Sequence, residues 1–301
     1  MHRRTFLRTA AAAAGLALLP SASLRAAESS TFTLNYAPHF GMFRHSAGKD
    51  LVAQLDFAAD RGFRSWEDNG MKSRPVADQQ RVASAMERLG MQMGVISCTR
   101  GTSDKLTFTS EDKDVRDGVV EGIKSVVDVA KRVRATWLTA VLGDVNPKLE
   151  PEYQTVLAVD LLNRCCDVLE PHGLVMVMEP LNHWTNHPGK FLVRSPQAFA
   201  LCKAVNRPSC KILFDIYHQQ VSEGNLIANI DRCWDEIAYF QIGDNPGRHE
   251  PGTGEIHYAN VLEHLHQRGY TGILGMEHGN ARPGAAGEMA VIEAYRAVDP
   301  H

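Results

Sequence analysis

The chain has 301 residues, and its 32 lysines and arginines nearly balance its 35 aspartates and glutamates, giving a net charge of −3. With 44% hydrophobic residues it can bury one large core, and α/β barrels commonly reach this length as a single domain. No basic stripe or long run of like charge occurs, so the sequence argues against a nucleic acid partner.

Residues 1–30 have the composition of an export signal. Arg3 and Arg4 are followed by Phe6 and Leu7 and then by an Ala/Leu stretch over residues 10–19. That stretch is too short to span a bilayer core of roughly 30 Å, so no stable membrane span is expected. The pattern resembles a twin-arginine (Tat) signal, which predicts passage through the Tat translocase and a periplasmic or otherwise exported protein. An ordinary Sec signal or an uncleaved anchor is the alternative.

From residue 31 to residue 301, strand-like and helix-like segments alternate. The expected strands are residues 32–39, 63–67, 91–97, 136–141, 174–179, 210–215, 237–241 and 272–277. The expected helices are residues 49–61, 76–89, 112–132, 153–169, 196–205, 226–234, 258–268 and 287–296. Eight such units predict a single-domain (β/α)₈ TIM barrel. An open doubly wound sheet is the alternative, but no GxGxxG follows the first strand.

The six cysteines show no spacing typical of a zinc site or a disulfide framework. Folding before export would leave them reduced, so we expect them to be buried and structural.

Four apolar runs in the second half of the chain each lead into one polar residue: Glu179, Asp215, Gln241 and Glu277. Such runs are typical of buried parallel strands, and a carboxylate at the end of one is costly to remove from water. Any one of the four alone is explained as well by a helix cap or a loop ion pair. Together, at the carboxyl ends of successive barrel strands, they predict a shared divalent metal site. Oxygen ligands without cysteine favour Mg²⁺ or Mn²⁺ over Zn²⁺.

Two further residues are candidates for substrate binding. His218 follows Asp215 by three residues and either contacts a substrate oxygen or makes a structural hydrogen bond. Arg248 lies in the glycine-rich loop 243–256, where its guanidinium suits a carboxylate or phosphate. The alternatives for this loop are pairing of Arg248 with Glu250 and a solvated turn.

Glu67 and His183 are candidates with evenly balanced alternatives. Glu67 ends the second expected strand, where it either contacts substrate hydroxyls or holds a neighbouring side chain. His183 comes just after Glu179 and either forms one wall of the pocket or packs in the core.

Several segments together resemble the hydroxypyruvate isomerase family of the xylose isomerase-like barrel superfamily. They are residues 179–182 (EPLN), 214–218 (FDIYH), 241–243 (QIG), 247–251 (GRHEP), 254–256 (GEI) and 275–278 (GMEH). The resemblance covers residues 32–297. It implies a metal on Glu179, Asp215, Gln241 and Glu277, with the two glutamates transferring a proton between adjacent carbons of a small hydroxy-carbonyl substrate through an enediolate.

Other functions are compatible with the same barrel. An epimerase or dehydratase of a sugar or cyclitol would use the same chemistry, and a periplasmic carbohydrate-binding barrel would bind without turnover. An endonuclease IV-like enzyme would need a histidine-rich multi-metal site and a basic groove, and neither is evident. The export signal leaves the physiological substrate open, and the sequence leaves open whether the chain forms a homo-oligomer.

Overall fold

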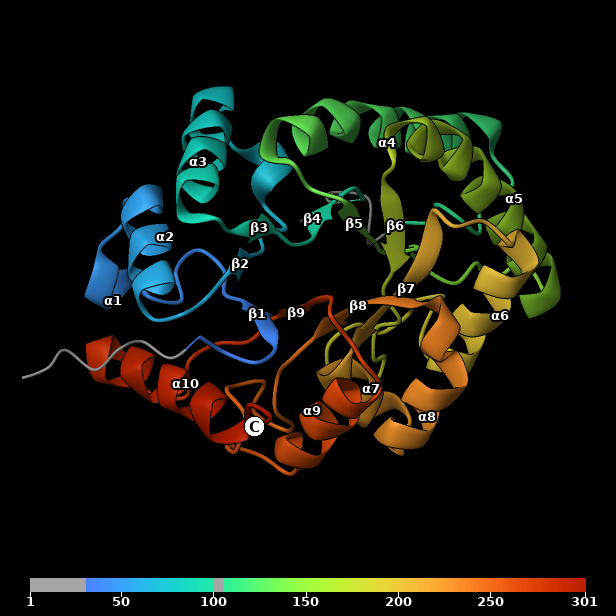
Figure 1. Cartoon of the computed structure of the whole chain (residues 1–301). Coiled ribbons are helices and arrows are strands. Elements are labelled where there is room, and N and C mark those ends of the chain that lie inside the picture. The colour runs from blue at the N-terminus through green and yellow to red at the C-terminus, as the bar shows by residue number, and fades with distance from the viewer. Residues whose placement is uncertain (1–30, 100–104) are drawn as a thin grey trace, which may run out of the picture.

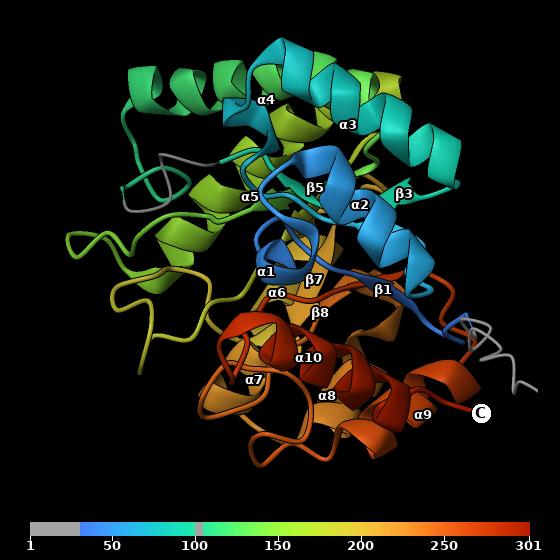
Figure 2. The same cartoon turned by 90° about the vertical axis from the view of Figure 1, so that its left-hand side faces the viewer.

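In the computed structural model, which describes residues 31–99 and 105–301, a ring of parallel strands is surrounded by helices (Figure 1). The strands are β1 (Asn35–Ala37), β2 (Ser65–Trp66), β3 (Gln92–Met93), β4 (Ile96–Ser97), β5 (Trp137–Ala140), β6 (Val175–Met178), β7 (Cys210–Asp215), β8 (Ile237–Gln241) and β9 (Ile273–Gly275). The longer helices are α2 (Leu51–Asp60), α3 (Val76–Leu89), α4 (Lys113–Val133), α5 (Pro151–Leu169), α6 (Ser195–Val205), α8 (Leu226–Cys233), α9 (Tyr258–Gln267) and α10 (Gly284–Val298). In the side view helices lie above and below the strands, and long loops project at one end (Figure 2).

The strands close into a barrel. Seven form a sheet in the order β1-β9-β8-β7-β6-β5-β4, and β2 and β3 form a second, two-stranded sheet. The amide of Glu67 donates to the carbonyl of Pro38 at 2.9 Å and joins β2 to β1. Strands β3 and β4 are the two halves of the expected strand 91–97, interrupted around Gly94. Counting β3 and β4 as one interrupted strand, the described strands are the eight strands of a single (β/α)₈ barrel. The predicted fold is confirmed.

The helices begin and end close to the predicted positions because local signals in the sequence set them. The Oδ1 atom of Asp112 accepts from the amides of Asp114 and Val115 and caps α4, and Arg134 ends that helix in a left-handed conformation. The short helices α1 (Arg44–Ala47) and α7 (Ile216–Ser222) were not predicted. The expected signal at residues 1–30 lies outside the described residues.

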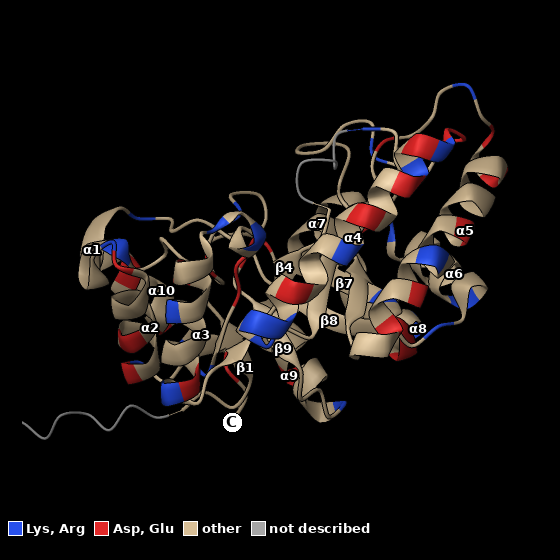
Figure 3. Ribbon diagram, turned by 90° about the horizontal axis from the view of Figure 1, so that it is seen from above, with Lys and Arg blue, Asp and Glu red and all other residues tan. Residues whose placement is uncertain are grey.

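Three further features can be compared with the described part of the chain. None of its helices is long and apolar enough to cross a membrane. Its basic and acidic residues are interspersed along the outer helices (Figure 3). All six cysteines are free and buried, as predicted.

The buried apolar residues form two separate layers. The larger lies between the strands and the helices and contains residues of both. The smaller contains no helix residue and fills the inside of the barrel; its members are Ala37, Val95, Val177, Leu213, Tyr239 and Ile273. Because strand side chains alternate, the residues two positions further along each strand also point into the barrel.

We expect Gly94→Ala to lower the free energy of unfolding by roughly 1–3 kcal/mol, the usual cost of overpacking. A Cβ atom at Gly94 would overlap the Tyr239 hydroxyl and lie 3.2 Å from Glu67 Cβ and 3.3 Å from the Trp66 carbonyl oxygen. Urea denaturation measures the change.

The matched control is Gly118→Ala on the exposed side of α4, where an added Cβ meets no described atom within 4 Å. It removes a helix-interior glycine and is expected to stabilise the protein by about 0.5–1 kcal/mol. Equal effects of the two substitutions would contradict the close approach at Gly94.

Candidate active site

The candidate site lies next to the apolar layer inside the barrel, towards the carboxyl ends of the strands. Two residues beyond Val177, Leu213 and Tyr239 on β6, β7 and β8 come three polar residues: Glu179, Asp215 and Gln241. The β7–β8 ladder pairs Asp215 with Gln241, so these two lie at the same level on neighbouring strands. On β9 the corresponding position is Gly275, and Glu277 follows two residues later. The alternation of the strands thus brings the four predicted residues to one end of the barrel.

Asp215 uses its two carboxylate oxygens differently. Oδ1 accepts from the backbone amides of Tyr217 at 2.8 Å and His218 at 3.3 Å, and so caps α7. Oδ2 accepts from Arg248 Nη2 at 2.9 Å. Asp215 therefore both caps a helix and pairs with a loop arginine, the two alternatives that the sequence offered to a metal site, and its part in a shared metal site stays a prediction.

Arg248 places a positive charge between two of the carboxylates. Its Nη2 atom lies 2.9 Å from Asp215 Oδ2 and 3.0 Å from Glu277 Oε2, and its guanidinium packs 4.9 Å from the centre of the Tyr217 ring. Glu250 does not pair with Arg248; its carboxylate instead accepts from the amide of Ala281 at 2.8 Å.

The loop that carries Arg248 is organised by Asp244, which the sequence analysis missed. The Asp244 side chain is fully buried, and its oxygens accept from the amides of Gly252 and Gly254 at 2.9 Å and of Ile256 at 3.1 Å. These bonds tie both arms of the loop together, so it is not a solvated turn. A single acidic residue before Asn-Pro-Gly was the available signal.

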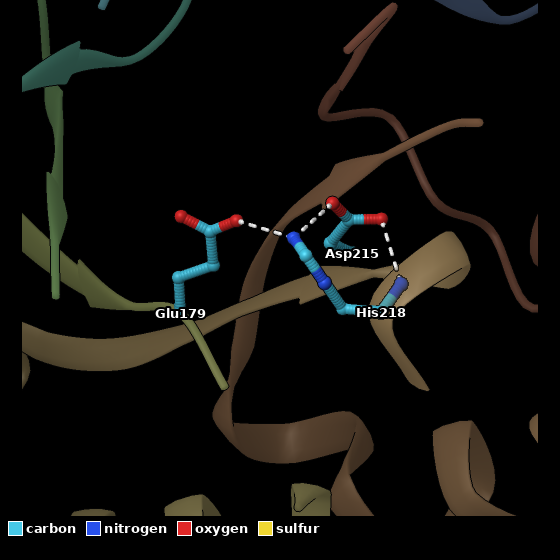
Figure 4. Close-up of side chains that lie close together, drawn as sticks. All are labelled: Glu179, Asp215 and His218. Atoms are coloured by element: carbon cyan, nitrogen blue, oxygen red, sulfur yellow. Dashed lines mark hydrogen bonds and ion pairs between the residues drawn. The ribbon is translucent and has the colours of Figure 1, made fainter. Parts of the chain in front are cut away.

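His218 lies between two carboxylates (Figure 4). Its Nε2 atom is 3.5 Å from Asp215 Oδ2 and 3.8 Å from Glu179 Oε1. One atom from each of these three residues lies within 4.8 Å of the others. Burial lowers the pKa of His218 to about 3, so the imidazole is neutral near neutral pH.

Asn182 determines which nitrogen of His218 carries the hydrogen. The Asn182 Oδ1 atom accepts from the amides of Thr185 and Asn186, both at 3.1 Å. Its Nδ2 group therefore faces His218 Nδ1, 2.7 Å away, and donates to it. The hydrogen of the neutral ring must then be on Nε2, which has no hydrogen-bond partner among the described residues. His218 presents a neutral donor to the site, a role that disfavours it as a metal ligand.

Glu179 and Glu277 hold their protons more tightly than in water, because both pKa values are raised. Burial raises the pKa of Glu179 well above its usual range, and the charges of Glu277 and Asp215 raise it further. Burial also raises the pKa of Glu277 to about 7, although Arg248 acts in the opposite direction. Asn69 Nδ2 donates to Glu277 Oε1 at 3.4 Å. Glu277 is therefore able to exchange a proton near neutral pH, and the pKa of Glu179 is shifted in the same direction.

The remaining two candidates differ in position. Glu67 is buried beside Gln241, whose Nε2 donates to Glu67 Oε1 at 3.3 Å. His183 stacks its ring 4.3 Å from that of the exposed Trp184. No contact of His183 with the four strand-end residues is found among the described residues. The histidine whose ring lies beside His218, at 5.2 Å, is His187.

The residues fit a divalent cation. Gln241 Oε1 is a buried acceptor that no described group donates to, which is costly unless a ligand completes it. Asp215 and Glu277 already share one cationic group, the Arg248 guanidinium. Carboxylate and amide oxygens without thiolate are the donor set that Mg²⁺ and Mn²⁺ prefer.

Comparison with known proteins identifies the family. The family model described as xylose isomerase-like TIM barrel matches residues 55–297. The chain belongs to this family. Hydroxypyruvate isomerase of Escherichia coli is 27% identical over 249 residues, which cover 82% of this chain and 92% of that protein. The 2-oxo-tetronate isomerase of Cupriavidus necator is 34% identical over 123 residues, covering 41% of this chain and 46% of that protein.

The family match and these two isomerases confirm the predicted resemblance to hydroxypyruvate isomerases. They also confirm the prediction that the protein is an isomerase. Among solved structures, the AP endonuclease of family 2 from Brucella melitensis superposes with a TM-score of 0.73 at 23% identity, covering 87% of this chain and 99% of that chain. A likeness at this identity shows the shared fold alone.

We expect the metal-free protein to lose stability as the pH rises from about 5 to about 8. Glu277 has a pKa of about 7 in the folded protein and 4.5 as a free side chain, so the folded state binds more protons in this interval. Raising the pH through the interval therefore favours unfolding. Urea denaturation in the presence of a chelator measures the dependence, and Glu277→Gln is expected to weaken it. Parallel curves for the two proteins would contradict the raised pKa.

Proposed function

We propose that this protein interconverts hydroxypyruvate and tartronate semialdehyde, or a closely related short hydroxy-keto acid, with Mg²⁺ or Mn²⁺ as cofactor. The proposal rests on three carboxylates gathered with the partnerless Gln241 Oε1 atom at one end of the barrel. Isomerase relatives over most of the chain support this reaction class.

The reaction is balanced by two proton movements and needs no redox partner. A base removes a proton from the hydroxymethyl carbon to give an enediolate. A proton is then delivered to the adjacent carbon, and the hydroxyl hydrogen moves from one oxygen to the other. Glu179 and Glu277 extend from β6 and β9, which are separated by two strands in the ring, and we assign these transfers to them. The pKa of Glu277, about 7, suits both acceptance and delivery of a proton near neutral pH, and burial raises the pKa of Glu179 in the same direction.

Two other side chains are assigned to the substrate. The Nε2–H group of His218 is neutral and without a described acceptor, so it can donate to a substrate oxygen without neutralising the glutamates. Arg248 Nε is buried and also lacks an acceptor among the described groups, and it suits the substrate carboxylate. When bound, a divalent cation on Glu179, Asp215, Gln241 and Glu277 supplies the positive charge that stabilises the developing anion.

The test is solvent exchange. Incubating hydroxypyruvate with the protein and Mn²⁺ in D₂O is expected to place deuterium on the reacting carbons, detected by NMR together with the product. Glu179→Gln and Glu277→Gln should each reduce the rate by roughly 10²- to 10⁴-fold because each removes one proton-transfer group.

Glu236→Gln is the control for this test. Glu236 is also largely buried, but it lies before β8 at the opposite end of the barrel and accepts from Lys211 Nζ at 2.6 Å. The rate of deuterium exchange in Glu236→Gln should equal that of the unmodified protein. Full activity in either site variant would contradict the two-glutamate assignment. Deuterium exchange on a sugar with none on short hydroxy-keto acids would instead favour the epimerase alternative.

We also propose export by the Tat translocase, on the basis of the Arg3-Arg4 pair and the apolar stretch that follows. Replacing both arginines with lysine is expected to retain the protein in the cytoplasm, as measured by fractionation. Export that survives the replacement would favour the Sec alternative.

A further inference from the structure

Glu67 is a buried carboxylate whose two oxygens are both engaged by other side chains. It follows β2 directly, has 2% of its surface exposed, and lies inside the barrel. The Tyr239 hydroxyl donates to its Oε2 atom at 3.1 Å, and Gln241 Nε2 donates to its Oε1 atom at 3.3 Å. Tyr239 and Gln241 are alternate residues of β8, so one strand supplies both donors.

Two glycines make room for the Glu67 carboxylate. A Cβ atom at Gly275 would overlap Glu67 Oε2, and a Cβ atom at Gly94 would overlap the Tyr239 hydroxyl. The β8–β9 ladder pairs Gly275 with Gln241. The carboxylate of Glu67 therefore occupies the interior position that a side chain of β9 would otherwise fill, directly beside Gln241.

This arrangement determines the orientation of the Gln241 amide. If the amide were turned over while Glu67 is ionised, its Oε1 atom would face a carboxylate oxygen with no hydrogen between them; the hydrogen bonds from Tyr239 and Gln241 favour this ionised form, although burial raises the pKa of Glu67. The Tyr239 hydroxyl cannot relieve this, because its hydrogen is already donated to Glu67. The amide therefore directs Nε2 towards Glu67. Its Oε1 atom is left buried and without a donor among the described residues.

We propose that Glu67 is a positioning residue, which acts through Gln241 by holding its Oε1 atom ready as an oxygen ligand for the divalent cation. The inference rests on the metal site of the proposed function. It decides between the two roles that the sequence left open for Glu67, because its oxygens are committed to Tyr239 and Gln241 rather than free for substrate hydroxyls. Gly94 and Gly275 belong to the same arrangement, because they leave the space that the Tyr239 hydroxyl and the Glu67 carboxylate occupy.

The experiment measures Mn²⁺ affinity of the full-length protein, without substrate, from the EPR signal of free Mn²⁺. Glu67→Gln keeps the shape of the side chain but can donate as well as accept, so it no longer selects one orientation of the Gln241 amide. Mn²⁺ binding should weaken by roughly 10- to 100-fold, the usual effect of losing a residue that orients a metal ligand. Glu236→Gln, the buried glutamate at the far end of the barrel, should leave the affinity unchanged.

A double-variant cycle separates positioning from general damage. Gln241→Ala removes the ligand itself, so adding Glu67→Gln to it should cost no further Mn²⁺ affinity. If Glu67→Gln does not fold, as judged by its circular dichroism, Tyr239→Phe takes its place. Because it removes the donor that holds Glu67 Oε2 in place, that variant loosens the carboxylate beside Gln241 and should weaken binding by a smaller factor in the same direction.

Unchanged Mn²⁺ affinity in folded Glu67→Gln would overturn the inference, and so would equal losses in the presence and absence of Gln241. Unmodified protein that binds no Mn²⁺ would also overturn it. Unmodified protein that binds Mn²⁺ but exchanges no deuterium would overturn the proposed isomerase reaction and leave the positioning role intact.

Discussion

The rest of the site depends on one constraint: several carboxylates are buried together inside one end of the barrel, and the groups around them must compensate their lost hydration. Glu67, Glu179 and Asp215 each have 5% or less of their surface exposed. Removing such groups from water is costly unless donors or cations replace the lost hydration. Asp215 receives two backbone amides and a guanidinium, and Glu67 receives a hydroxyl and an amide. The nearest such group found for Glu179 is His218 Nε2, at 3.8 Å. The compensation is incomplete, which is the condition expected of a site that binds a cation.

The elements around the site supply what these carboxylates require. Helix α7 begins at Asp215 because its carboxylate caps it, and that same turn places His218 over the site. The loop after β8 is held by Asp244 so that Arg248 reaches two acids. These contacts come from segments far apart in the sequence, so the site forms only when the barrel closes.

The same geometry supports the proton transfer that we propose for this site. His218 is neutral, and Asn182 keeps its hydrogen on Nε2, so it donates without competing for the substrate proton. The pKa values of Glu179 and Glu277 are both raised. These residues follow β6 and β9, which are separated by β7 and β8 in the ring. An isomerase and an epimerase share these requirements. They differ in the substrate, so the strand-end residues alone do not decide between the two proposals.

The sequence by itself determined the barrel, the positions of its helices, and the four residues that end successive strands. It could do so because these depend on local patterns: apolar runs, capping residues and the alternation of strand side chains. It gave Glu67 and Arg248 only as candidates and missed Asn182, Asp244 and the short helix α7. The bonds of Glu67, Arg248 and Asn182 to Gln241, Glu277 and His218 span 174, 29 and 36 positions. Such contacts form only in the closed tertiary structure, because the donor and the buried carboxylate are distant in the sequence and become neighbours only when the barrel folds.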